Sequence, residues 1–360
     1  MTTLAARRLL IICSLLFSAA CTDVAGGGNG LNDLSCSVPS QFIADGGPGK
    51  DGIPALTDPT MVAANDPDAS YLLPTDRVIG LRIGAEYLAI PLNIGWWHEI
   101  VNVDRGAVHL SITHCPLTGS SLVFDRGAIS DAEFGVSGLL FMNNLMMYDR
   151  TGQASLWPQM VRGARCGARS GTPLPMFPSV EISWAGWIAL HPDTRVVSSR
   201  TGHSRNYTSY PYGNYAQIAN PALLAPMPSI DGRRPPKERV LGVILANGAA
   251  VALPFGALDA LGELAAVPIT SGGATAVVLW DRTAQGAAAF VPSAAGQTLT
   301  FRVAGSAILD DQTGSTWSTD GRAIAGPLAG TALDAIDDAF VAYWFAWAAF
   351  YPESVLWTAP

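Results

Sequence analysis

The chain has 360 residues, of which 49% are hydrophobic and only 14% are charged. This composition is typical of a globular protein that is long enough for two domains. Its formal net charge is −8 and it has only two lysines, Lys50 and Lys237. Because no basic run is present that could neutralise phosphate groups, we expect no nucleic-acid partner.

Residues 1–20 have the pattern of an export signal. An arginine pair precedes the apolar run Leu9–Phe17, and small residues then lead to Cys21. The run is shorter than the roughly 20 residues that span a bilayer, so the mature protein is predicted to leave the cytoplasm. Cys21 after small residues is typical of a bacterial lipoprotein in the cell envelope, with a lipid on this cysteine as the membrane contact. Ser18 stands where such signals usually have Leu, so ordinary signal cleavage is the alternative.

Three segments recur in the same order about 160 positions apart, which is the signature of an internal repeat. "DRVIGLRIGAEYLAIPL" returns as "ERVLGVILANGAAVALPF", "YDRTGQASLW" as "DDQTGSTW", and "SWAGWIALHPDTRVVS" as "YWFAWAAFYPESVLW". The sequence therefore predicts two homologous copies. The predicted divisions are a tether and N-terminal extension (21–75), a first copy (76–203), a Pro- and Tyr-rich linker (204–237) and a second copy (238–360).

Each copy is expected to be mainly β, in a β-rich α+β fold of short antiparallel strands. Short apolar runs separated by Gly, Asn and Asp predict the strands Val78–Ile83, Tyr87–Leu92, Val108–Cys115, Ser121–Phe124, Gly138–Phe141 and Leu145–Tyr148. Asn143 and Asn144 tolerate positive φ, so "FMNNLMM" predicts a tight hairpin.

One short helix is expected to close each copy. The predicted helices are Trp184–Leu190 and Val341–Phe350, ended by Pro192 and Pro352. Their tryptophans recur at three-residue spacing, which places them on one helical face and favours core packing.

The two copies differ in the residues that carry chemistry. All five histidines and every cysteine precede residue 204; the histidines are His98, His109, His114, His191 and His203. The second copy lacks side chains that bind soft metals or act as nucleophiles near neutral pH. Any chemistry is therefore expected in the first copy.

Cys115 is the most informative of these residues. In the strand Val108–Cys115, successive side chains alternate between faces, so His114 shares an apolar, core-directed face with Ile112 while Cys115 lies on the opposite face. His114 is therefore not expected to assist the cysteine. The segment before this strand carries His98, and two neighbouring strands would bring His98 within reach of Cys115.

Three interpretations of Cys115 stay open. It is a reactive or metal-binding thiolate, assisted by His98 and by Asn143, with Cys115 and His98 as metal ligands. Alternatively, it forms a disulfide with Cys166 or Cys36, since an oxidising compartment permits one, or it fills space in the core. If Cys21 carries lipid, three cysteines remain, so at least one thiol has no internal partner.

Other polar residues near this motif have structural interpretations. Asp149 is expected to form a turn with Thr151, because Asp310 occupies the matching place in the other copy. Met146 and Met147 are expected to fill the core. Glu99 is expected to be a solvated carboxylate. His191 is expected to hydrogen-bond the last carbonyl groups of its helix.

The chain resembles a known family at several motifs. "THCPLTGSSLVFDR", "FGVSGLLFMNNLMMYDRTGQASLW", "SWAGWIALHPDTRVVS" and "YPYGNY" are similar to the hallmark segments of the bacterial and archaeal domain-of-unknown-function family 3179, over about residues 75–358. The resemblance implies no established reaction or cofactor. Family members often have a second cysteine where Thr118 stands here, so a local dithiol mechanism is excluded while a single thiolate is not.

Two hypotheses of function follow. In the first, the exported protein uses Cys115 and His98 to hold a soft metal or to perform one-thiol chemistry. In the second, it is a non-enzymatic envelope module that binds a small ligand or an envelope partner in the groove between the copies, lined by exposed Tyr210, Tyr212 and Tyr215. No Ser-His-Asp, phosphate-loop, zinc-protease or dinucleotide fingerprint is evident in the sequence.

Overall fold

The computed structural model describes Leu31 and residues 34–359. The predicted signal segment 1–20, Cys21 and the glycine-rich tether at 25–30 lie outside the described residues. Within the described part of the chain, no helix is long and apolar enough to cross a membrane. We refer to residues 34–203 as the first half, to 204–237 as the linker and to 238–359 as the second half.

The first half contains a five-stranded sheet of order β12-β4-β5-β13-β3. Its strands are β3 (Met61–Ala63), β4 (Arg77–Ile83), β5 (Glu86–Pro91), β12 (Val180–Ser183) and β13 (Arg195–Val197). Two four-stranded sheets complete the half, in the orders β2-β6-β7-β8 and β1-β9-β10-β11.

These two sheets carry the cysteine strand and the predicted hairpin. The first consists of β2 (Leu56–Thr57), β6 (Ile100–Arg105), β7 (Val108–Cys115) and β8 (Ser120–Asp125). The second consists of β1 (Ile43–Asp45), β9 (Phe134–Phe141), β10 (Asn144–Asp149) and β11 (Leu156–Pro158). Short 3-10 turns lie at Ser40–Phe42, Pro67–Ala69, Arg126–Ile129 and Gln159–Val161.

The second half contains a four-stranded sheet of order β25-β14-β15-β26 and smaller sheets beyond it. The four strands are β14 (Arg239–Ile244), β15 (Ala250–Pro254), β25 (Ala339–Tyr343) and β26 (Val355–Leu356). A three-stranded sheet comprises β16 (Leu264–Ser271), β17 (Ala274–Asp281) and β18 (Gly286–Phe290). The remaining strands are β19 (Ser293–Ala294), β20 (Gln297–Thr298), β21 (Phe301–Ala304), β22 (Ala307–Asp310), β23 (Thr316–Trp317) and β24 (Ala323–Ala325).

Within the described residues, four short α-helices accompany these sheets. They are α1 (Leu92–His98), α2 (Trp184–Leu190), α3 (Phe255–Asp259) and α4 (Trp344–Phe350). Glycines let two of them approach the sheets closely. A Cβ atom at Gly80 would lie 2.4 Å from the Trp187 ring, and one at Gly242 would lie 1.9 Å from the Trp347 ring. The mainly β fold class is confirmed, and the helical tryptophans pack in the core as predicted.

The halves follow the same topology. In the first half, β4 lies between the antiparallel strands β12 and β5, and β13 is parallel to β5. In the second half, β14 lies between the antiparallel strands β25 and β15, and β26 is parallel to β15. Asp149 and Asp310 each accept a hydrogen bond from a tryptophan Nε1, at 2.7 and 2.9 Å. These parallels support the predicted duplication, which stays a prediction.

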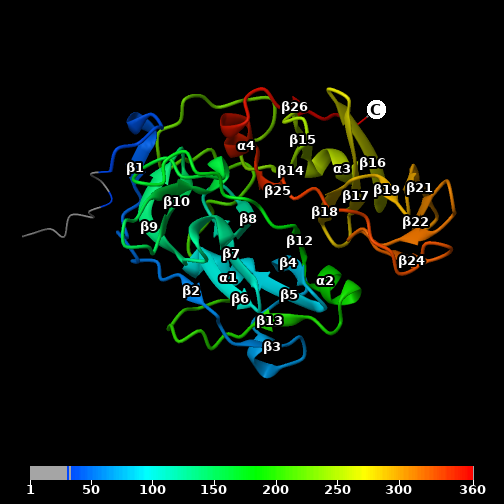
Figure 1. Ribbon diagram of the computed structural model, residues 1–360, viewed down its shortest axis with the longest axis horizontal. Helices are drawn as coiled ribbons and strands as arrows, with labels where there is room; N and C mark the ends of the chain where they lie inside the picture. Colours follow the sequence, from blue (N-terminus) through cyan, green and yellow to red (C-terminus); the bar gives the residue numbers. More distant parts are fainter. Residues whose placement is uncertain (1–30, 32–33, 360) are drawn as a thin grey trace, which may run out of the picture.

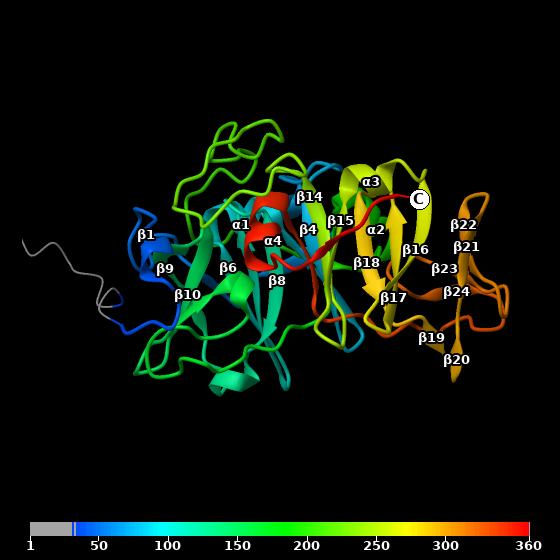
Figure 2. The same ribbon diagram turned by 90° about the horizontal axis from the view of Figure 1, so that it is seen from above.

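The two halves lie side by side along the longest axis (Figures 1 and 2). In each half, the last residue of one strand is hydrogen-bonded to a turn of the other half. The Tyr343 backbone N–H donates to the Thr118 carbonyl at 2.8 Å, and the Ser183 N–H donates to the Ala284 carbonyl at 2.9 Å. Strand β25 therefore lies beside β8, and β12 lies beside β18. The open edges of these four strands form part of the interface, and the Tyr351 hydroxyl after α4 adds to it by donating to the Met160 carbonyl at 2.8 Å.

Several predicted boundaries are confirmed and others need correction. The helix Trp184–Leu190 has its predicted bounds, whereas the second helix begins at Trp344 because β25 occupies the preceding residues. The hairpin turn lies at Met142 and Asn143, both with positive φ, while Asn144 already belongs to β10. The largest error concerns His98, which ends helix α1 instead of lying on a strand beside β7.

The cysteine pairing is settled among the described residues. Cys36 and Cys166 form a disulfide, and Cys115 is a free, buried thiol. A disulfide from Cys115 to either of them, one of the three interpretations, is therefore excluded.

Candidate functional site

Cys115 is enclosed by protein on all sides. Its side chain is 1% exposed and belongs to an apolar cluster with Leu117, Leu145 and Trp157. The Sγ atom accepts a hydrogen bond from the Leu145 N–H at 3.3 Å and lies 3.7 Å from the Asn143 carbonyl oxygen. Burial, with a smaller contribution from the Glu99 carboxyl, raises the pKa of the thiol to about 11. The environment therefore favours the neutral thiol over a thiolate.

His98 is bonded to other groups. One ring nitrogen, Nδ1, is 2.8 Å from the Pro54 carbonyl, and the other, Nε2, is 2.7 Å from the Tyr207 hydroxyl. Burial lowers the pKa of this imidazole to about 4. Both nitrogens are thus engaged, and the structure does not bring His98 to Cys115 as a shared site.

Asn143 meets Cys115 only through its backbone. Its side-chain oxygen accepts hydrogen bonds from the Leu224 and Ala225 N–H groups at 2.6 and 2.7 Å, and its amide donates to the Ala225 carbonyl at 2.7 Å. This side chain therefore holds the linker against the first half. Among the described residues, no group of three or more His, Cys, Asp or Glu side chains is arranged to hold a metal ion.

The reactivity of Cys115 stays a prediction that one measurement can test. With a pKa of about 11, only about one thiol in a thousand is ionised at pH 8. We expect a thiol-reactive disulfide reagent to modify the folded protein at least about 100-fold more slowly than the urea-unfolded protein. Modification of the folded protein at the rate of an exposed cysteine would instead support the thiolate hypothesis.

A different cluster of polar groups lies where the halves meet. Arg77 Nε is 2.5 Å from Glu181 Oε1, and the two side chains are 7% and 3% exposed. The same guanidinium donates to the Gln285 carbonyl of the second half at 2.9 Å. Ser121 donates to the other carboxylate oxygen of Glu181 at 2.6 Å. This buried ion pair therefore joins β4, β12 and β8 to the second half.

The charges in this cluster shift the pKa values of its members. Burial alone would raise the pKa of Glu181, but the Arg77 and Arg239 charges outweigh burial and hold it below its ordinary value. Burial lowers the pKa of Arg77 to about 10. The pair is thus ionised at neutral pH.

His114 belongs to this cluster and not to an apolar core face. Its Nδ1 lies 3.1 Å from the Ser121 hydroxyl, and burial lowers its pKa to about 4. The imidazole is therefore neutral at physiological pH. The alternation of β7 was predicted correctly, and Leu110 and Ile112 of the face assigned to the core are buried in an apolar cluster. Only His114, at the end of that face, borders a cavity instead.

This cavity has a volume of 240 Å³ and lies between the halves. We call it the Arg239 cavity. Its charged and polar wall comprises Asp76, Arg77, His114, Glu181 and Arg239, and its aromatic wall comprises Trp96, Tyr210 and Tyr343. The aromatic rings come from α1, the linker and β25, so the cavity exists only where all three segments meet.

Arg239 has unused hydrogen-bonding capacity. Glu181 is bonded to Arg77, and Asp76 accepts hydrogen bonds from the Leu73 N–H and the Asn93 amide at 2.9 and 3.1 Å. The half-buried guanidinium of Arg239, by contrast, makes no hydrogen bond or ion pair to any residue that the structure describes.

The Tyr210 hydroxyl, also in this wall, is buried without a hydrogen-bond partner among the described residues. Two side chains of one cavity thus have donors without a hydrogen-bond partner among the described residues, one buried and one half-buried, which is the arrangement expected of a ligand site.

The linker tyrosines were predicted to be exposed in the groove, and this needs correction. Tyr215 is buried and donates to the Leu117 carbonyl at 2.9 Å. Tyr212 is half-buried and packs against the apolar cluster around Cys115. Of the three, only Tyr210 lines the Arg239 cavity.

Sequence reasoning missed Arg77, Glu181 and Arg239 as site residues. A signal was present, because "DRV" and "ERV" place Arg77 and Arg239 at matching positions of the repeat. The register agrees: Arg77 pairs with Ser183 and Arg239 pairs with Tyr343, directly before the tryptophans that begin α2 and α4. Paired arginines at the same repeat position would have pointed to the interface.

The comparisons with known proteins agree with this description. No curated protein and no solved structure matches the chain. A family model described as "protein of unknown function (DUF3179)" matches residues 50–354. The match covers most of both halves, the whole linker and every residue of the Arg239 cavity. The chain therefore belongs to the DUF3179 family.

Proposed function

We propose that the protein is a binding module that holds a small organic anion in the Arg239 cavity. The observation that carries this proposal is the half-buried Arg239 guanidinium, which makes no hydrogen bond or salt bridge to the described residues. A guanidinium binds a carboxylate or phosphate through two parallel hydrogen bonds. The flanking Trp96, Tyr210 and Tyr343 rings favour a ligand with a planar apolar part.

The neutral state of His114 fits this role. A neutral imidazole adds no charge, and its Nε2 makes no hydrogen bond to the residues covered by the structure. It can donate to or accept from a ligand, depending on its tautomer. Arg239 therefore supplies charge, whereas His114 and Tyr210 supply directional hydrogen bonds.

Calorimetric titration tests the proposal with benzoate, acetate, inorganic phosphate and the cation benzylamine. We expect benzoate to bind and benzylamine not to bind. Arg239→Gln should weaken benzoate binding about 10- to 100-fold, because a charge-assisted hydrogen bond contributes about 1.5–3 kcal/mol.

The matched control is Arg302→Gln, which removes an exposed arginine paired with Asp311 and should leave binding unchanged. Thermal unfolding of both variants shows whether they are folded. Benzoate binding that is equally tight in folded Arg239→Gln, or no binding of any anion to the wild-type protein, would overturn the proposal.

We further propose that this module is exported and anchored to the cell envelope by lipid on Cys21. The signal-like residues 1–20 support this, and so does the Cys36–Cys166 disulfide, because disulfides persist in oxidising compartments. Mass spectrometry of the protein from membranes should find a diacylglycerol on Cys21; an unmodified N-terminus there would contradict the anchor.

A further inference from the structure

A second cavity adjoins the Arg239 cavity. It has a volume of 280 Å³, and three residues line both spaces: Ala216, Arg239 and Tyr343. We call it the Asp259 cavity. Because the Arg239 side chain belongs to both walls, a carboxylate bound to its guanidinium lies at the boundary of the two cavities. A ligand held there can place one substituent in each of them.

Four charged residues line the Asp259 cavity: Lys237, Glu238, Arg239 and Asp259. Two of them are bonded to groups outside its wall. Both carboxylate oxygens of Glu238 accept hydrogen bonds from Arg234. The Lys237 Nζ donates to the Ala222 carbonyl at 2.7 Å and lies 3.4 Å from the centroid of the Tyr215 ring. One cation and one anion of the wall are left without such a partner.

Asp259, the anion, has unused capacity to accept hydrogen bonds. It is half-buried at the end of α3, and its Oδ1 accepts from the Gln285 amide at 3.1 Å. Its Oδ2 accepts no hydrogen bond, and the carboxylate makes no ion pair, within the part of the chain that the structure describes. Arg282 interacts with it electrostatically but is paired with Glu263.

A second acceptor lies in the same wall. The side-chain oxygen of Gln285 accepts no hydrogen bond from any described residue, while its amide nitrogen donates to Asp259 and to the Arg282 carbonyl. An ammonium group carries three donors and a positive charge, so it would satisfy both acceptors.

We infer that the ligand is an aromatic amino acid, with its ring in the Arg239 cavity, its carboxylate at Arg239 and its ammonium group at Asp259. This inference rests on the proposed function and adds the ammonium group to it. The observation that carries it is the presence of two opposite charges in the wall of one cavity, neither of which makes an ion pair with a described residue. The three groups diverge from one α-carbon, so the ring and the ammonium group enter different cavities.

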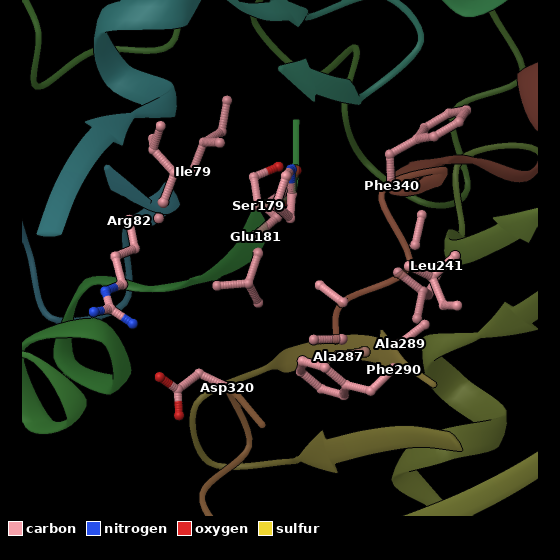
Figure 3. Close-up of a pocket in the computed structure, with 18 of the residues that line it drawn as sticks. Ile79, Arg82, Ser179, Glu181, Leu241, Ala287, Ala289, Phe290, Asp320 and Phe340 are labelled. Atoms are coloured by element: carbon pink, nitrogen blue, oxygen red, sulfur yellow. The ribbon is translucent and has the colours of Figure 1, made fainter. Parts of the chain in front are cut away.

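A third cavity between the halves is separate from this site. It has a volume of 310 Å³, and β12 and β18 form its facing walls (Figure 3). Neither Arg239 nor Asp259 lines it. The affinity of a ligand bound there would therefore not depend on either side chain.

Calorimetric titration with three ligands tests the inference. They are L-phenylalanine, 3-phenylpropionate, which lacks the amine, and 2-phenylethylamine, which lacks the carboxylate. We expect phenylalanine to bind the wild-type protein at least about tenfold more tightly than either, because each of the others loses one charge-assisted contact. Asp259→Asn should reduce the preference for phenylalanine over 3-phenylpropionate to less than about threefold, since a neutral amide does not balance an ammonium group.

Asp193→Asn, at an exposed aspartate, is the matched control and should keep the full preference. Thermal unfolding shows whether both variants are folded. The inference is overturned if the wild-type protein binds 3-phenylpropionate as tightly as phenylalanine, or if folded Asp259→Asn keeps the full preference. Either result, with 3-phenylpropionate bound, leaves the anion site at Arg239 intact. No binding of any of the three ligands would overturn both proposals.

Discussion

Glu181→Gln is expected to lower the free energy of unfolding by about 3–5 kcal/mol, the usual cost of leaving one member of a buried ion pair without its partner. Arg77 is 7% exposed and would keep its charge next to a neutral amide. The loss should be large because Glu181 also accepts the Ser121 hydroxyl, which connects the cluster to His114. Urea unfolding monitored by tryptophan fluorescence measures the change.

Two further variants show whether the loss of stability comes from the unpaired buried charge. The double variant Arg77→Met, Glu181→Leu should recover most of the lost stability, because an apolar pair leaves no buried charge. Arg302→Met, at an exposed pair, should change stability by less than about 0.5 kcal/mol. If Glu181→Gln were as mild as Arg302→Met, the buried pair would not hold the halves together.

Glu99→Gln is expected to remove a large pH dependence of stability. Burial raises the pKa of Glu99 from 4.5 to about 8, so the folded protein keeps a proton that the unfolded chain loses near pH 4.5. The free energy of unfolding therefore falls as pH rises from about 4.5 to 8. Above pH 8 the full penalty is present, on the order of 5 kcal/mol for a shift of this size. The glutamine variant avoids this penalty.

Urea unfolding at pH 5 and pH 9 checks this expectation. Wild type and Glu99→Gln should be similar at pH 5, and the variant should be several kcal/mol more stable at pH 9. His98 and His114 have lowered pKa values and act in the opposite sense below pH 6.5, but they are common to both proteins and cancel. Glu353→Gln, at an exposed position, is the control. Parallel stability curves for wild type and Glu99→Gln would show that Glu99 is ionised in the folded protein.

Glu99 also shows where sequence reasoning reached its limit. Its neighbourhood was interpreted as strand, with the carboxylate in solvent. The structure instead ends helix α1 at His98, and Glu99 turns the chain with a φ of 57°. The seven-residue helix contains Gly95, Trp96 and Trp97, which are not strong helix formers, so its sequence gives little local signal. Because this segment was predicted to be a strand, His98 was expected near Cys115. In the structure, its Nε2 instead lies 2.7 Å from the Tyr207 hydroxyl.

The local pattern predicted the strands well. The alternation in β7, the hairpin at Asn143 and the tryptophan faces of α2 and α4 all depend on spacing within a few residues. The Arg239 cavity depends on contacts between distant parts of the chain. Arg77 and Glu181 are 104 positions apart, and the Gln285 carbonyl that Arg77 also binds is 208 positions away. No local pattern encodes such pairs, although Arg77 and Arg239, at matching positions of the repeat, indicate where the cavity lies.

A crystal structure of the protein with benzoate bound tests the central claim most directly. We expect the benzoate carboxylate to lie within hydrogen-bond distance of the Arg239 guanidinium, with the benzoate ring among Trp96, Tyr210 and Tyr343. Benzoate bound at another place, while Arg239 stays without a partner in an otherwise empty cavity, would contradict it.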